Sequence, residues 1–174
     1  MVGYSAPNND VLVAGSPFIQ ELKVHTATNV KAGRLVEKGS AASQIVACSV
    51  GGNPIGVVGW NPHSAYKPAT LATDYAANSF APVMNGPMIV VLTLVTDSVV
   101  KGDFLIAGAN GKVRKAAAVT ATVPAGETTV TSTSAQPAIT LVGSFPEDGL
   151  IVAQAEEDQN ATEGDKAIIA RWLL

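Results

Sequence analysis

The chain has 174 residues, enough for one domain with a substantial core. Only 14% of the residues are charged, against roughly 25% in ordinary soluble domains, and the mean hydropathy is +0.27. This composition favours a protein that covers weakly polar surface in an oligomer or on a larger assembly. The longest apolar run, residues 87–95, is much shorter than the roughly 20 residues of a membrane-spanning helix, so we expect no membrane partner.

Charge is distributed unevenly along the chain. Residues 1–115 carry nine Lys/Arg and six Asp/Glu, a balance of +3, whereas residues 116–174 carry two Lys/Arg and eight Asp/Glu, a balance of −6. This asymmetry is typical of oriented contacts between subunits or of solvated surface, and the sequence leaves both open. Neither part has a basic stripe with interleaved aromatic side chains, so we expect no nucleic-acid partner.

Residues 1–16 mix Gly, Pro and Asn with short apolar pieces, which predicts an extended N-terminal arm rather than a helix. They have neither a basic start nor a long apolar stretch, so we expect no signal peptide. A single β-rich domain is predicted over 17–174, because short apolar or alternating runs are separated there by turn residues. The predicted strands are 18–24, 35–36, 44–50, 55–60, 80–95, 103–107, 112–116, 139–143, 149–154 and 166–173.

Two Asn-Gly pairs mark tight turns in this series. Asn85-Gly86 predicts a two-residue hairpin inside residues 80–95, and Asn110-Gly111 predicts a second hairpin. The chain has no convincing long amphipathic helix. The pattern therefore favours an all-β fold, a small β-barrel or a sandwich-like domain with long loops.

Two segments depart from the pattern of strands and turns. Residues 61–79 hold two prolines and two tyrosines with weak periodicity, which predicts a long excursion with one helical turn around 69–75. Residues 116–138 are almost wholly Ala, Thr, Val and Ser. They are interpreted either as an exposed hairpin, with strands at 119–123 and 128–133, or as a flexible excursion.

Aromatic residues are scarce, and five of them are predicted to anchor the core: Phe18, Trp60, Phe80, Phe104 and Trp172. Both tryptophans end a predicted strand, and an interface position is the alternative for each. Cys48 is the only cysteine, so there is no intramolecular disulfide or thiolate cluster. Its place in a predicted strand favours a small buried core residue.

The sequence offers few groups for catalysis. A hydrolytic site built on His63, Asp74 and a serine would lack a nucleophile-elbow motif. Residues 108–113 superficially resemble a phosphate loop, but the glycine spacing is too short and Val113 replaces the hydroxyl that would bind Mg²⁺. A hairpin turn is the better interpretation, and we expect a protein that is not an enzyme and has no catalytic or cofactor-binding residues.

The acidic loop 156–165 is the one candidate for a metal. Calcium requires six to eight oxygen ligands on a tightly curled loop. The EF-hand pattern fails because Glu163 stands where the turn glycine belongs. A solvated loop is the default, a looser Ca²⁺ site stays open, and we assign no metal ligand.

A binding module is the alternative from another functional class. The excursion 61–79 would then present Trp60, Tyr66 and Tyr75 as a stacking platform for carbohydrate or for host attachment.

Four stretches, taken in order, resemble the head-decoration, or capsid-cementing, proteins of tailed double-stranded DNA viruses. They are VKAGRLVEKGS at 30–40, IGVVGW at 55–60, APVMNGPMIVVLTLVTDSVVKGDFLIAGANGKVRKA at 81–116, and GLIVAQAEEDQNATEGDKAIIARWLL at 149–174. Each stretch consists of turn residues and β-formers, so the resemblance depends on their order. Neither 61–79 nor 116–138 matches the family pattern.

The resemblance implies a β-rich protein, often a homotrimer, on the outside of the capsid at or near its three-fold positions. There it would clamp neighbouring major capsid protein subunits against the pressure of packaged DNA, and its N-terminal arm would contribute to docking. The implied partners are other copies of the chain and the major capsid protein. The implied locations are the virion and, during assembly, the host cytoplasm. Three linked contacts would raise avidity without new chemistry.

Overall fold

The computed structural model describes residues 11–26, 28–61, 63–95, 97–116 and 150–174. Regular structure in this part of the chain is almost entirely β-strand, which confirms the all-β prediction, and the exception is a 3-10 turn at Ala109–Gly111. Apart from Ala116, the predicted excursion 116–138 lies outside the described residues, as does the predicted strand 139–143. None of the described residues forms a helix of the length and apolarity that a membrane crossing requires.

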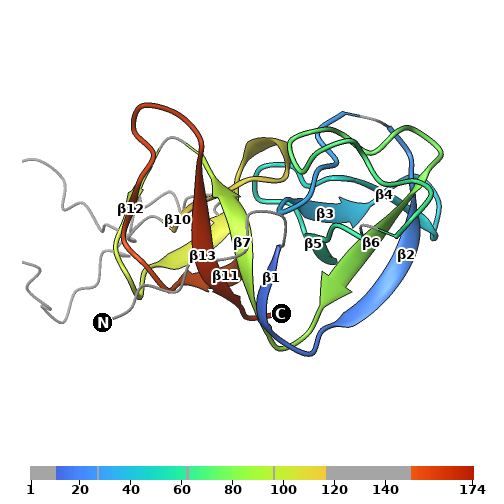
Figure 1. Cartoon of the computed structure of the whole chain (residues 1–174). Coiled ribbons are helices and arrows are strands. Elements are labelled where there is room, and N and C mark those ends of the chain that lie inside the picture. Colours follow the sequence, from blue (N-terminus) through green and yellow to red (C-terminus); the bar gives the residue numbers. More distant parts are fainter. Residues whose placement is uncertain (1–10, 27, 62, 96, 117–149) are drawn as a thin grey trace, which may run out of the picture. The chain divides into compact units, whose positions relative to one another are not determined.

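The first five-stranded barrel lies between residues 18 and 85. Its strands are β2 (Phe18–Val24), β3 (Leu35–Lys38), β4 (Gln44–Ala47), β5 (Gly56–Val58) and β6 (Phe80–Asn85). They close in the order β2-β4-β3-β5-β6, as Figure 1 shows in blue to green. β2 and β4 run parallel, and the other neighbours are antiparallel.

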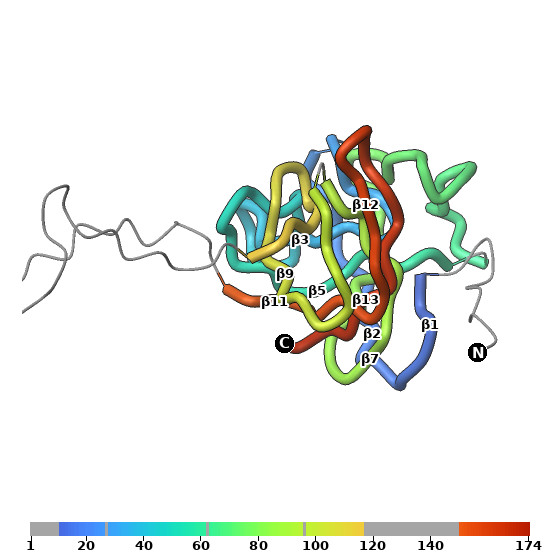
Figure 2. Tube along the Cα trace, turned by 90° about the vertical axis from the view of Figure 1, so that its left-hand side faces the viewer, coloured from blue at the N-terminus to red at the C-terminus, as the bar shows by residue number. Residues whose placement is uncertain are grey.

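The second half of the chain forms another ring. The sheet that contains this ring has the strands β1 (Leu12–Gly15), β7 (Met88–Leu94), β9 (Phe104–Ala107), β10 (Val113–Lys115), β11 (Ile151–Ala155) and β13 (Lys166–Trp172). They follow the order β1-β7-β10-β9-β11-β13, and β13 also pairs with β7. All of these strands except β1 therefore form a closed ring. Figure 2 shows β13 and β7 in this ring, with the short strand β12 (Gln159–Asn160), which pairs with β8 (Ser98–Val99).

The two rings have the same strand order. When the strands are counted from one to five along each barrel, the order around the ring is first, third, second, fourth and fifth. In both rings the first and third strands run parallel, and every other pair is antiparallel. The chain is therefore a tandem repeat of one five-stranded barrel, which the sequence pattern did not predict.

The pairing register is repeated as well. Four register pairs of the first barrel each have a counterpart in the second. Ile19–Met84 corresponds to Ile89–Arg171, Val24–Ile45 to Leu94–Val113, Val36–Ala47 to Leu105–Lys115, and Val57–Met84 to Gln154–Arg171. Main-chain bonds follow the same correspondence. The Cys48 N–H donates to the Leu35 carbonyl at 3.0 Å, and the Ala116 N–H donates to the Phe104 carbonyl at 2.8 Å.

Equivalent glycines turn the chain into the second strand of each barrel. Gly33 has φ +74° and Gly102 has φ +95°, a left-handed conformation that glycine adopts without steric cost. The Arg34 N–H closes the first of these turns on the Lys31 carbonyl at 3.2 Å.

β1 is an extra strand outside the second ring. It is antiparallel to the first half of β7, with Leu12 facing Val90 and Gly15 facing Met88. The Val91 N–H donates to the Val11 carbonyl at 2.8 Å. The last residues of the predicted arm 1–16 are thus part of a sheet, and residues 1–10 lie outside the described residues.

Burial alternates along β7 as a half-buried strand requires. Met88, Val90, Leu92 and Leu94 are buried, and the residues between them are half-buried. Each such side chain contributes about 1.5–3 kcal/mol when fully buried. The equivalent strand β2 differs, because its first four residues are all exposed.

The pair Asn85-Gly86 does not form the predicted hairpin, because β6 and β7 belong to different barrels and Gly86-Pro87 is the link between them. A type I′ hairpin needs positive φ at both central residues. Gly86 has φ +100°, but Asn85 is not in the left-handed region. The Asn85 side chain instead accepts the Gly86 N–H at 2.7 Å and the Trp172 indole N–H at 2.9 Å.

Most of the predicted aromatic anchors lie outside the core. Phe18, Phe80 and Phe104 are 70%, 38% and 47% exposed. Each is the first residue of its strand, where the chain enters the barrel from a loop or link. Trp172 is buried as predicted, and Trp60 is half-buried. The largest fully buried side chain among the described residues is Tyr75.

Local turn predictions had mixed outcomes. The hairpin at Asn110-Gly111 is confirmed, because β9 and β10 pair antiparallel around it and both residues have positive φ. The helical turn predicted around 69–75 is wrong. The chain makes a single turn there, in which the Thr73 N–H donates to the Thr70 carbonyl at 3.1 Å.

A buried arginine connects the two barrels. Arg34 is 8% exposed, and its Nη1 donates to the Asn29 Oδ1 at 3.0 Å and to the Asn110 carbonyl at 3.1 Å. Burial lowers the pKa of Arg34, while the charges of Asp165 and Asp74 oppose that shift. The guanidinium therefore joins a loop of the first barrel to the hairpin turn of the second.

Candidate interaction surfaces

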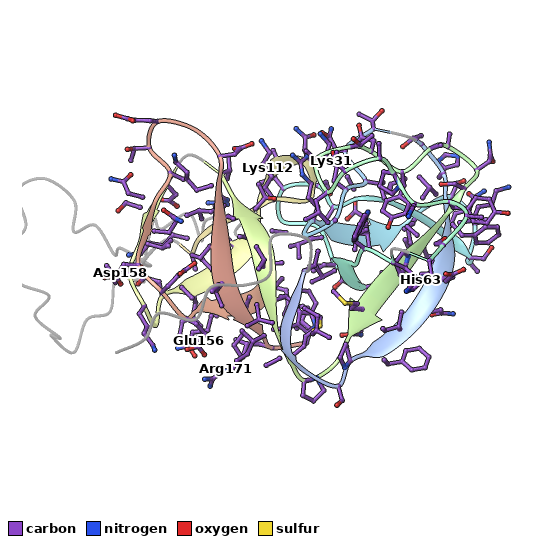
Figure 3. The ribbon with its side chains drawn as sticks, in the orientation of Figure 1. Lys31, His63, Lys112, Glu156, Asp158 and Arg171 are labelled. Carbon is purple, nitrogen blue, oxygen red and sulfur yellow. The ribbon has the colours of Figure 1, made fainter. Side chains whose placement is uncertain are left out.

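The two groups of the hydrolase alternative have separate surroundings. His63 is exposed, and its main-chain N–H donates to the Asn61 Oδ1 at 3.0 Å. The Asp74 carboxylate lies 4.0 Å from the Lys31 ammonium. Figure 3 shows Lys31 and His63 apart on the ribbon. The described contacts thus place Asp74 beside a lysine, and no described contact brings it to His63.

The glycine-containing turn at 108–113 is the loop of the β9–β10 hairpin, as predicted. Its Lys112 ammonium lies 2.6 Å from the Asp165 carboxylate, so the charge that a phosphate would use is already paired.

Two carboxylates of the acidic loop 156–165, Glu156 and Asp165, form ion pairs within the chain. Glu156 accepts a charged contact from Arg171 at 2.5 Å and lies 3.7 Å from the Lys101 ammonium. Asp158 accepts the Lys101 main-chain N–H at 2.8 Å. Figure 3 shows Glu156, Arg171 and Asp158 at one end of the second barrel. Two lysines of the first part, Lys101 and Lys112, are therefore paired with carboxylates of the acidic second part.

The rest of this loop also binds its own chain. Glu157 accepts the Ile169 N–H at 2.8 Å, and Asn160 accepts both the N–H and the hydroxyl of Thr162. The described residues contain no group of three or more His, Cys, Asp or Glu placed to hold a metal. The open question of a looser Ca²⁺ site thus gains no support from the geometry.

Cys48 is fully buried, which confirms the predicted core position. Its Sγ donates to the Glu37 carboxylate at 3.6 Å. Burial, with the negative charge and hydrogen bond of Glu37, raises the pKa of the thiol to about 12. The thiol is therefore protonated and inert at neutral pH.

The three rings proposed as a carbohydrate platform do not share a surface. Tyr75 is fully buried, and its hydroxyl donates to the Gly59 carbonyl at 3.1 Å. Tyr66 is 51% exposed and packs against Phe80 with the two rings tilted by 56° and 5.6 Å between their centroids. Only Tyr66 and part of Trp60 remain available for stacking.

Exposed apolar side chains gather instead at strand ends. At the start of β2, Phe18 is 70% and Ile19 is 55% exposed. The adjoining strands β1, β7 and β13 line a shallow, mainly apolar hollow of about 290 Å³, whose walls include Ala14, Pro87, Met88, Ile89 and Trp172. The sequence pattern did not predict this surface, because the alternation in 18–24 placed Phe18 in the core.

A second apolar area lies where β11 begins and β13 ends. Ile151, Leu173 and Leu174 are all more than a third exposed. The Leu173 N–H donates to the Val152 carbonyl at 3.0 Å, which holds the C-terminal residues against the start of β11. Exposed apolar surface of this kind is typical of contact sites between proteins.

No family model and no curated protein matches the chain. Among solved structures, the N base of the head fiber protein gp8.5 of bacteriophage phi29 matches with a TM-score of 0.50 and 12% sequence identity. The match covers 91% of this chain and 95% of that chain. At this identity the likeness concerns the fold. The chain therefore shares its fold, over nearly all of its length, with the base of a phage head fiber.

Proposed function

We propose that this chain is a structural protein of a phage virion. It binds the outer surface of the capsid as a homotrimer, at or near the three-fold positions, and stabilises the head against internal DNA pressure. The observation that carries the proposal is the fold match with the phi29 head fiber base, which extends over 91% of the chain. The ordered resemblance to head-decoration proteins supports the same assignment independently.

The surface supports binding rather than catalysis. The candidate phosphate-binding side chain Lys112 is ion-paired with Asp165, and the candidate catalytic carboxylate Asp74 lies 4.0 Å from the Lys31 ammonium. The side chains left exposed and unexplained by the fold are apolar, among them Phe18, Ile19 and Leu173. Apolar contacts, multiplied by three in a trimer, suit long-lived attachment to a repeating shell.

The proposed partners follow from this role. They are other copies of the chain and the major capsid protein, without a nucleic-acid or membrane partner. The protein would act on the outside of the virion, after assembly in the host cytoplasm.

The test uses capsids of the parent phage prepared without this protein. Purified protein at micromolar concentration should sediment with these capsids, and cryo-electron microscopy should show density on their outer surface at three-fold positions. Decorated capsids should also release DNA at a higher temperature than bare ones. An unrelated β-barrel protein of similar size serves as the control for nonspecific adsorption. Protein that stays in the supernatant at saturating concentration would overturn the proposal.

The host-attachment or carbohydrate-binding alternative is less well supported, because Tyr75 is buried. A glycan array distinguishes it from capsid binding. A hit that disappears in Tyr66→Ala, together with no capsid binding, would favour the alternative.

A further inference from the structure

The two barrels differ at one equivalent place, the outer edge of the first strand. In the second barrel, β10 pairs with β7 only at Leu94, and β1 covers the preceding edge over Met88 to Val90. In the first barrel, β4 pairs with β2 only at Lys23 and Val24. No described strand occupies the edge from Phe18 to Glu21. We call this unoccupied edge the β2 edge.

Exposure follows this difference residue by residue. The register makes Phe18 equivalent to Met88 and Gln20 equivalent to Val90. Phe18 is 70% exposed, whereas Met88 is 3% exposed under β1. Gln20 is exposed, whereas Val90 is fully buried. The first residues of β2 are therefore exposed where the equivalent residues of β7, which pair with β1, are buried.

The backbone at the β2 edge is also ready for a strand. Val91 donates its N–H to Val11 of β1 at 2.8 Å. Its equivalent is Glu21, whose N–H lies on the side of β2 away from β6, because the Lys23 N–H two residues further along donates to the Ser43 carbonyl at 3.0 Å on that side. Unpaired N–H and C=O groups along a strand are a template for another strand, which gains main-chain hydrogen bonds when it adds.

We propose that the β2 edge takes the N-terminal residues 1–10 of a second copy of this chain. These residues lie directly before β1, the strand that fills the equivalent position in the second barrel. Val2, Tyr4 and Ala6 alternate there with Gly3 and Ser5, and no charge occurs before Asp10. This pattern suits a strand that packs one apolar side, next to exposed Phe18 and Ile19.

The length of the segment fits an exchange between copies. Ten extended residues span up to about 33 Å, and the four residues of the β2 edge need only about 13 Å of strand. The remaining residues are enough to cross from one copy to its neighbour. Each copy would donate its segment to the next, a head-to-tail contact that closes into a ring. The inference rests on the proposed homotrimer and supplies the contact that holds it together.

The first experiment measures the mass of the full-length protein by sedimentation across a concentration series. Glu21→Pro removes the outward N–H but keeps an edge-strand position that proline tolerates, and Glu21→Ala keeps the N–H as its matched control. We expect Glu21→Pro to weaken association by about tenfold or more, because it removes one main-chain hydrogen bond and adds a steric block. We expect Glu21→Ala to weaken association by less than about threefold. Equal association of both variants overturns the proposal.

Phe18→Lys and Ile19→Lys keep the test decisive if Glu21→Pro does not fold. Both side chains are exposed, so melting temperature should be unchanged while association weakens. Unchanged association in these variants also overturns the proposal.

The second experiment identifies the donor segment. In a Cys48→Ala background, single cysteines at residues 2 to 6 are mixed with a separate chain that carries Ile19→Cys, and disulfides are formed by mild oxidation. Crosslinked pairs between the two chains support exchange. A disulfide that forms only when both cysteines lie in one monomeric chain shows that the segment covers its own barrel, and overturns the proposal.

Capsid binding is measured in parallel. A monomer that still binds capsids keeps the capsid-binding role but overturns both the exchange and the homotrimer. A trimer that does not bind capsids supports the exchange and overturns the function.

Discussion

The indole N–H of Trp172 donates to the side-chain oxygen of Asn85 at 2.9 Å, and these two residues occupy the same position in the fifth strands of the two barrels. The repeated unit is therefore tied to its copy through equivalent residues. Asn85 also accepts the N–H of Gly86, at the start of the link between the barrels. One side chain thus fixes both the link and the end of β13.

This contact predicts a graded response to substitution at Trp172. Trp172→Phe removes the indole N–H but keeps most of the buried ring, so we expect a loss of about 1 kcal/mol. Trp172→Ala also opens a cavity and should cost about 3–5 kcal/mol. Urea denaturation measures both values. In a double-mutant cycle, Asn85→Ala should couple to Trp172→Phe, and strictly additive losses would contradict the bond.

Arg34 is predicted to contribute more than an ordinary surface charge. Arg34→Ala leaves the Asn29 side chain and the Asn110 carbonyl without their donor, so we expect a loss of about 2–4 kcal/mol. Lys38→Ala, at the exposed end of the strand that follows Arg34, is the control and should change stability by less than about 0.5 kcal/mol. Thermal denaturation that shows equal effects for the two variants would rule out a connecting role for Arg34.

Gly33 and Gly102 provide a matched pair for backbone strain. Alanine at either position must adopt positive φ, at a cost of about 1–2 kcal/mol. A Cβ at Gly33 would lie 2.8 Å from the Val91 carbonyl oxygen, whereas a Cβ at Gly102 would meet nothing within 4 Å. Gly33→Ala should therefore be the more destabilising variant, by about 1 kcal/mol or more. The reverse order in urea midpoints would contradict this packing.

Stability is predicted to fall at alkaline pH. Burial raises the pKa of Cys48 from 9.0 to about 12 and that of Tyr75 from 10.0 to about 12. Above pH 9 the unfolded chain therefore binds fewer protons than the folded one, so the free energy of unfolding decreases as pH rises toward 12. Urea midpoints between pH 8 and 11 measure the slope. Cys48→Ala should reduce this slope, first between pH 9 and 10. An unchanged slope in this variant would show that ionisation of Cys48 does not cause the loss of stability.

Local pattern was sufficient for strands and for turns that glycine controls. Residues 18–24 form a strand because apolar and polar residues alternate, and Asn110-Gly111 forms a hairpin turn because both residues tolerate positive φ. Asn85-Gly86 carries the same two letters and links two barrels instead. The strand that pairs with the one before an Asn-Gly turn is decided by tertiary contacts. The dipeptide itself carries no information about that partner.

The repeat left a weak signal in the sequence. Val30, Gly33 and Leu35 recur at the same spacing as Val99, Gly102 and Phe104, and a search for internal similarity could have used them. The exposed position of Phe18 had no such signal. It depends on which edge of β2 is covered, a property of the assembled barrel rather than of the strand.

The pairing of β1 with β7 also bears on synthesis. Leu12 leaves the ribosome early, yet its partner Val90 follows only after the whole first barrel has been made. Domains fold as their residues emerge, N-terminal part first, so the first barrel can close while β1 still has no partner strand. A nascent chain thus presents a free strand next to an open edge for several seconds at ordinary translation rates of about 5–20 residues per second. Copies made close together on one message would meet in that interval.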